Sequence, residues 1–228
     1  MQAFLGMGRT RRRLLHFSAA ACALLGAAFT APLGAAPAAA RPPPVVAVVG
    51  DSLSAEFGLA RGSGWVSLLA QRLAARPSGA SVLNASISGD TTAGGLARLP
   101  ALLKEAHPAI VVIELGGNDA LRGTPIPEVR RNLDAMAARA AAAGAKVLIL
   151  GIQVPPNYGR RYNDEFAQMY AAVAAAHDAA LVPFMLKGVA DRPDARDWFQ
   201  ADGIHPIAKA HPLILDNVWP ALEPLLKR

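Results

Sequence analysis

Five short apolar runs, separated by longer amphipathic segments, constrain the fold more than any other feature of this sequence. The clearest is the run Val-Val-Ala-Val-Val at residues 45–49, which ends at a glycine. Short continuous apolar runs are typical of strands that are buried on both faces of a parallel sheet. The other four predicted strands cover residues 81–85, 109–115, 146–152 and 180–183.

Helical periodicity fills much of the sequence between these runs. Apolar residues recur at helical spacing in residues 65–73, 126–143 and 161–177. The tail, residues 207–226, reads as a closing helix with kinks or breaks near Pro212 and Pro220. Alternating strands and helices predict an α/β protein: a three-layer α/β/α sandwich with a flavodoxin-like parallel sheet of about five strands. We expect residues 41–228 to form this single domain.

Residues 1–40 have the layout of a cleaved secretory signal peptide. Four arginines at 9 and 11–13 precede an apolar stretch, residues 14–33, and small residues follow, so that cleavage after Ala36 or Ala40 fits. Residues 10–15 also resemble a twin-arginine signal, and an uncleaved anchor is the alternative. The signal predicts a periplasmic or secreted protein with no stable membrane anchor after cleavage. Cys22 is the only cysteine, so the mature chain has no disulfide.

The net charge of +6 does not indicate a nucleic-acid partner. Four of the 23 basic residues lie in residues 1–40, which contain no acidic residue. The remaining 19 basic and 17 acidic residues give +2, and no basic run survives among them. Nucleic-acid binding usually requires clustered basic surface, so we expect no such partner.

Polar residues gather at or just beyond the predicted strand ends. They occupy residues 50–54, 84–92 and 116–119, and a fourth polar segment lies at 202–206. In a parallel sheet the carboxyl ends of the strands share one edge, where ligands bind. Ser52 is therefore a candidate nucleophile, which would need a base to take its proton.

These segments resemble the four blocks of the SGNH subgroup of GDSL hydrolases, in order and in spacing, over residues 44–226. Residues 115–123 and 157–162 look like those of the bacterial periplasmic arylesterase, acyl-CoA thioesterase I and lysophospholipase group. The matching positions are Ser52, Gly89, Asn118, Asp202 and His205.

The resemblance implies an esterase or thioesterase that forms an acyl-enzyme on Ser52. His205 would act as the base and Asp202 would orient it. The backbone N–H groups of Ser52 and Gly89 and the side-chain amide of Asn118 would form the oxyanion hole. Asp51, beside the nucleophile, would be structural. We expect no cofactor, and we find no ligand spacing typical of a metal site.

The substrate is less closely determined than the reaction. The segment after the fourth strand contains Val154 and Pro155, which would offer an apolar wall to an acyl or aryl group, with Leu121 opposite. The expected partner is a small-molecule acyl ester or thioester. Two alternatives stay open: a carbohydrate O-acetyl esterase on the same scaffold, and a non-catalytic flavodoxin-like binding module.

Overall fold

A parallel five-stranded sheet forms the centre of the described chain. The structure is a computed structural model that describes residues 43–77 and 79–227, so the predicted signal peptide and Cys22 lie outside the described residues. The strand order is β2-β1-β3-β4-β5, and all neighbouring pairs are parallel. The prediction of an α/β fold with about five parallel strands is confirmed. The strands are β1 (Val45–Gly50), β2 (Ser81–Asn84), β3 (Ile110–Glu114), β4 (Lys146–Leu150) and β5 (Ala180–Val182).

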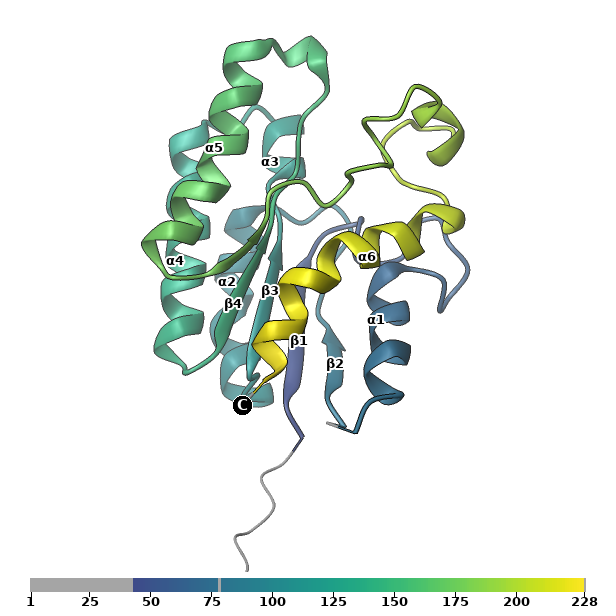
Figure 1. Ribbon diagram of the computed structural model, residues 1–228. Coiled ribbons are helices and arrows are strands. Elements are labelled where there is room, and N and C mark those ends of the chain that lie inside the picture. The colour runs from purple at the N-terminus through teal and green to yellow at the C-terminus, as the bar shows by residue number, and fades with distance from the viewer. Residues whose placement is uncertain (1–42, 78, 228) are drawn as a thin grey trace, which may run out of the picture. The chain divides into compact units, whose positions relative to one another are not determined.

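Helices cover both faces of the sheet and give the predicted three layers. Figure 1 shows α1 and α6 on one face, with α2, α4 and α5 on the other. In the described part of the chain, no helix combines the length and the apolar character needed to cross a membrane. The helices are α1 (Trp65–Ala74), α2 (Thr92–Ala106), α3 (Gly117–Leu121), α4 (Ile126–Ala142), α5 (Arg160–Ala176) and α6 (His211–Leu222).

The central strands are buried along most of their length, which explains their continuous apolar sequence. Every residue of β3 is buried, as are all but the first residue of β1 and of β4. The edge strand β2 is mostly exposed. Burying an aliphatic side chain stabilises a fold by about 1.5–3 kcal/mol, so β1, β3 and β4 supply much of the core.

Helix α2 was not predicted, because its sequence contains residues that disfavour helices. Gly94, Gly95 and Pro100 all lie within it. The hydroxyl of Thr91 caps the helix by accepting a hydrogen bond from the Gly94 N–H. Pro100 lacks the N–H that would bond to the carbonyl of Leu96, and Arg139 of α4 donates to that carbonyl instead. Tertiary contacts therefore compensate for poor local propensity.

The C-terminal tail forms three pieces rather than one helix. A short 3₁₀ turn at Ala208–Ala210 precedes α6, and another at Glu223–Leu226 follows it. Pro212 lies in the first turn of α6, where its missing N–H costs nothing, whereas Pro220 lies inside the helix near its end. The predicted breaks are present, and the long loop before α6 carries Asp202 and His205.

Candidate active site

The hydroxyl of Ser52 lies at the end of a hydrogen-bonded chain of three side chains. Its Oγ is 2.8 Å from Nε2 of His205, a residue 153 positions later in the sequence. Nδ1 of His205 is 2.6 Å from Oδ2 of Asp202. An ionised carboxylate only accepts hydrogen bonds, so Nδ1 carries a proton and Nε2 accepts from the Ser52 hydroxyl. A serine, an imidazole and a carboxylate are therefore in contact in the order that nucleophilic catalysis requires.

The loop before α6 is shaped so that Asp202 and His205 meet despite their close spacing. Oδ1 of Asp202 accepts from the backbone N–H groups of Ile204 and His205, at 2.9 and 3.0 Å. Gly203 makes the bend with φ of +69°, which other residues rarely adopt. The carbonyl of His205 accepts from the Gln200 N–H at 2.7 Å. These bonds fix the imidazole relative to its carboxylate.

Asp202 remains ionised at any ordinary pH. Burial acts to raise its pKa, but the hydrogen bonds from His205 and Ile204 outweigh burial and lower the pKa to about 2. The side chain of His205 is only 15% exposed. The ring of Phe57 packs on it with 4.3 Å between ring centroids. The imidazole is thus held by a charged acceptor on one edge and by an aromatic ring on one face.

The backbone N–H groups of Ser52 and Gly89 are the unoccupied donors near this chain of side chains. Within residues 43–77 and 79–227, neither N–H donates to a protein acceptor. Gly89 has φ of +79°, and a Cβ built there would meet no described atom within 4 Å. The backbone conformation therefore favours glycine, and the space where a side chain would begin is open.

The Asn118 side chain joins the segments that carry Ser52 and Gly89. Asn118 lies in the first turn of α3, after β3. Its Nδ2 donates to Oδ2 of Asp51 and to the carbonyl of Asp90, each at 2.9 Å. Asp51 directly precedes Ser52, and Asp90 directly follows Gly89. The amide thus lies between the two N–H groups, with both of its hydrogens engaged by protein acceptors.

Two buried carboxyl groups lie beneath the Ser52 segment. Asp51 is 2% exposed, and its Oδ1 accepts from the Leu53 N–H. Burial raises the pKa of Asp51 to about 6, although its hydrogen bonds and the nearby His205 oppose the rise. Glu114 at the end of β3 is fully buried, and burial together with the Asp51 charge raises its pKa well above the ordinary range. The structural role expected for Asp51 agrees with these contacts.

Residues that the sequence analysis missed complete this buried network. Trp65 Nε1 donates to Oγ of Ser54, which donates in turn to Oε2 of Glu114 at 2.7 Å. A lone glutamate in an apolar strand was a signal that could have identified Glu114. Arg98 also contacts the site, through bonds to Asp90, Ala85 and Gly50. No sequence motif connects Trp65 or Arg98 to it.

Apolar side chains are exposed beside His205 and on the segments that follow β3 and β4. Phe57 packs against His205 and is itself 46% exposed, and Leu121 on α3 is 54% exposed. After β4, Val154 is half-buried against the core and Pro155 is exposed. Their role in substrate binding stays a prediction.

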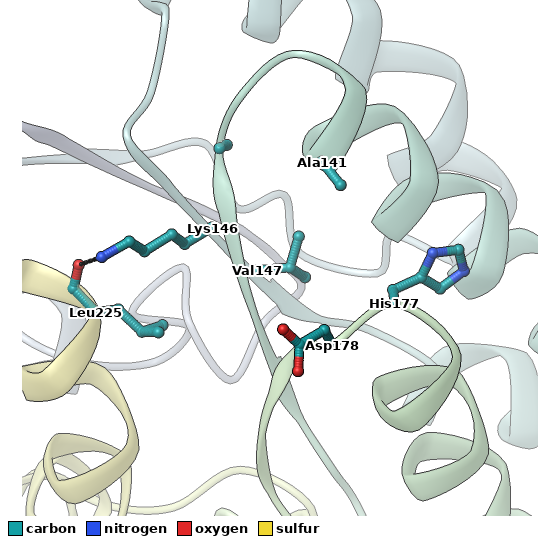
Figure 2. A pocket seen from close by; sticks show the side chains of 7 residues that line it. Ala141, Lys146, Val147, His177, Asp178 and Leu225 are labelled. Carbon is teal, nitrogen blue, oxygen red and sulfur yellow. Dashed lines mark hydrogen bonds between the residues drawn. The ribbon is translucent and has the colours of Figure 1, made fainter.

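A separate pocket of about 320 Å³ lies at the opposite edge of the sheet. It is formed where β4 begins and where α4 and α5 end, as Figure 2 shows. There Lys146 donates to the carbonyl of Leu225 at 2.9 Å, and His177 pairs with Asp134. Lys146 and His177 thus bind neighbouring protein groups, and no serine or cysteine lines this pocket, so it offers no nucleophile comparable with Ser52.

Two further carboxylates near Ser52 are bonded to basic side chains. Asp90 binds Arg98, and Asp202 binds His205. Nowhere in the described ranges do three or more His, Cys, Asp or Glu side chains gather so that they could hold a metal ion. We assign no residue to a metal or cofactor.

The fold and this arrangement define a family. Residues 48–213 match the GDSL-like lipase/acylhydrolase family, and the chain belongs to that family. It is 59% identical over 179 residues to esterase TesA of Pseudomonas aeruginosa, and the aligned region covers 78% of this chain and 88% of that relative. It is 43% identical over 179 residues to thioesterase 1/protease 1/lysophospholipase L1 of Escherichia coli K12, covering 78% of this chain and 83% of the relative. A crystal structure of TesA matches with a TM-score of 0.76 and 58% identity, over 79% of this chain and 99% of that one.

Proposed function

We propose that this protein is an exported serine hydrolase that cleaves acyl or aryl esters and thioesters through an acyl-enzyme on Ser52. The observation that carries the proposal is the Asp202–His205–Ser52 chain, with contacts of 2.6 and 2.8 Å. Membership of the GDSL-like lipase/acylhydrolase family and the names of the relatives support the same reaction class.

The reaction follows from the positions of the three side chains. Oγ of Ser52 attacks the carbonyl carbon while its proton passes to Nε2 of His205. The tetrahedral intermediate collapses, the bond to the leaving oxygen or sulfur breaks, and His205 returns the proton to that atom. Water then attacks the ester on Ser52 while His205 takes its proton; the acyl–Oγ bond breaks, His205 returns that proton to Oγ of Ser52, and the carboxylic acid leaves. Asp202 stabilises the imidazolium and holds its tautomer without becoming protonated.

The oxyanion formed in each step needs donors that are fixed before the charge develops. The N–H groups of Ser52 and Gly89 are available, and the Asn118 amide lies between their segments. For Asn118 to donate, one of its two hydrogen bonds must be exchanged. The bond to the Asp51 carboxylate is charge-assisted and stronger than the bond to the neutral Asp90 carbonyl. We therefore assign the Asp90 bond as the one that the oxyanion replaces.

The substrate proposal rests on the apolar surroundings of Ser52. Leu121, Val154 and Pro155 would contact the acyl or aryl group. Cleavage of residues 1–40 as a signal peptide would deliver the enzyme to the periplasm or medium, away from cytosolic acyl-CoA. Lysophospholipids and other acyl esters then become the natural substrates, and the enzyme needs no nucleic-acid partner or stable membrane anchor.

Hydrolysis of p-nitrophenyl acyl esters by purified protein tests the reaction. Ser52→Ala should remove hydrolysis while circular dichroism stays unchanged. Ser63→Ala is the matched control, because the Ser63 hydroxyl is exposed and bonds only to its own turn at the Ala60 carbonyl. Hydrolysis by Ser52→Ala at the wild-type rate would reject the proposal. A panel that compares acetylated sugars with C8–C16 acyl esters separates a carbohydrate O-acetyl esterase from the proposed enzyme.

A further inference from the structure

Arg98 binds three acceptors that belong to separate segments around Ser52. It projects from α2, and its side chain is 23% exposed. Nε donates to Oδ2 of Asp90 at 2.8 Å, and Nη2 donates to the carbonyl of Gly50 at 3.3 Å. Nη1 donates to the carbonyl of Ala85. One guanidinium therefore links the end of β1, the residue after β2 and the start of α2.

These acceptors flank the two free backbone donors of the site. Gly50 is two residues before Ser52, and Gly89 lies between Ala85 and Asp90, both of which bind Arg98. Asp90 also offers its carbonyl to Asn118. Ser52 is thus two residues from an acceptor of Arg98, Gly89 is next to another, and Asn118 bonds to the same residue, Asp90.

Few other bonds hold the Gly89 turn against the end of β1. The Ile87 N–H donates to the carbonyl of Gly50 at 3.0 Å, which anchors the first residue of the turn that the Asp90 N–H closes on the Ile87 carbonyl. Arg122 donates to the carbonyl of Gly89 from an exposed position. A planar guanidinium presents five donors in a fixed fork, which a lysine ammonium does not reproduce. Arginine is therefore the side chain suited to bridge these acceptors.

We propose that Arg98 is a positioning residue that fixes the distance between the N–H groups of Ser52 and Gly89. This inference rests on the proposed function. Oxyanion stabilisation depends on donors set in place before the charge forms, so spacing errors affect the transition state more than the bound substrate. Misplacing reacting groups by about 1 Å can cost about 10²-fold in rate. Arg98 does not touch the substrate in this scheme.

The test compares kcat and KM for p-nitrophenyl esters in Arg98→Lys and Arg98→Ala. Both variants should lose about 10- to 100-fold in kcat, with KM within about twofold of wild type. Added guanidinium ion should restore part of the kcat of Arg98→Ala, because it can bind the same acceptors. Arg72→Ala is the matched control: Arg72 also projects from a helix, α1, and pairs with a carboxylate, that of Asp216, but its bond does not reach the segments that carry Ser52 and Gly89. Its kcat should be unchanged.

A wild-type kcat in either Arg98 variant would overturn the proposal, as would a loss confined to KM. If Arg98→Ala fails to fold, Arg98→Lys decides: a lowered kcat supports positioning, and a wild-type kcat rejects it. The Ser52→Ala result is independent of these outcomes. An inactive Ser52→Ala together with active Arg98 variants rejects only the role of Arg98, whereas an active Ser52→Ala rejects the proposed function itself.

Discussion

Replacing Asp51 by asparagine should stabilise the fold while it weakens catalysis. The pKa of Asp51 rises from its ordinary value of 3.8 to about 6, chiefly because the carboxyl group is buried. The folded protein therefore holds this proton more tightly than the unfolded chain does. Below its unfolded pKa, Asp51 is protonated in both the folded and the unfolded protein, so its ionisation does not reduce the free energy of unfolding. That reduction grows as pH rises towards 6 and is constant above.

The size of the effect follows from the two pKa values. Each pKa unit corresponds to about 1.4 kcal/mol, so ionised Asp51 reduces the free energy of unfolding by about 3 kcal/mol at pH 8. The same linkage gives about half that amount at pH 5. Asparagine has nearly the same shape and no charge. Both Asp51 oxygens accept an N–H group, and the amide nitrogen of asparagine accepts none, so the substitution also costs about 1–3 kcal/mol of buried hydrogen bonding. Asp51→Asn should therefore be more stable than wild type by up to about 2 kcal/mol at pH 8, or by up to about 4–8 °C in Tm.

Urea unfolding followed by circular dichroism at pH 5 and pH 8 measures this difference. Asp216→Asn is the control, since Asp216 pairs with Arg72 at the surface and is 60% exposed. Its stability should stay within about 1 kcal/mol of wild type at both pH values. The same Asp51→Asn protein should lose about 10-fold in kcat, because Asn118 loses its charge-assisted acceptor. An Asp51→Asn protein that is less stable than wild type at pH 8 would refute the reasoning.

Other substitutions test the remaining parts of the site. Asn118→Ala should lower kcat by about 10²–10³ with little change in KM, and steady-state kinetics on p-nitrophenyl butyrate will show whether KM changes instead. Asp202→Asn should lower kcat by about 10⁴, because the amide no longer selects the tautomer in which Nε2 of His205 accepts; a loss under tenfold would contradict that role. Leu121→Ser should raise KM severalfold for C12 esters and leave C4 esters unchanged, and equal effects on both chain lengths would remove Leu121 from the acyl site.

The sheet was predictable because buried parallel strands have continuous apolar sequences. Strand ends differ from the predicted ranges by one or two residues, since apolar runs such as 146–152 continue past the last ladder bond into the loop. Helix α2 escaped prediction because its stability comes from packing and from the contact of Arg139 with Leu96. That contact joins residues 43 positions apart, so it cannot be recognised from the sequence of α2 alone.

The polar segments at the strand ends were visible in the sequence, but their connections were not. Ser52 was singled out at a strand end, Asp202 and His205 by their resemblance to the family's blocks, and the structure places the three in contact. The buried pair Asp51 and Glu114 depends on contacts between β1 and β3. The three bonds of Arg98 also join segments that are distant in sequence, so only the folded chain reveals them.

Covalent labelling with a fluorophosphonate tests the central claim most directly. The reagent forms a stable bond to a serine oxygen only where a base and oxyanion donors activate that serine. Intact-mass analysis and peptide mapping of the mature protein should find one adduct per chain, on Ser52. The adduct should be absent from Ser52→Ala. An unlabelled wild-type protein, or an adduct on a different serine, would contradict the assignment of Ser52 as the nucleophile.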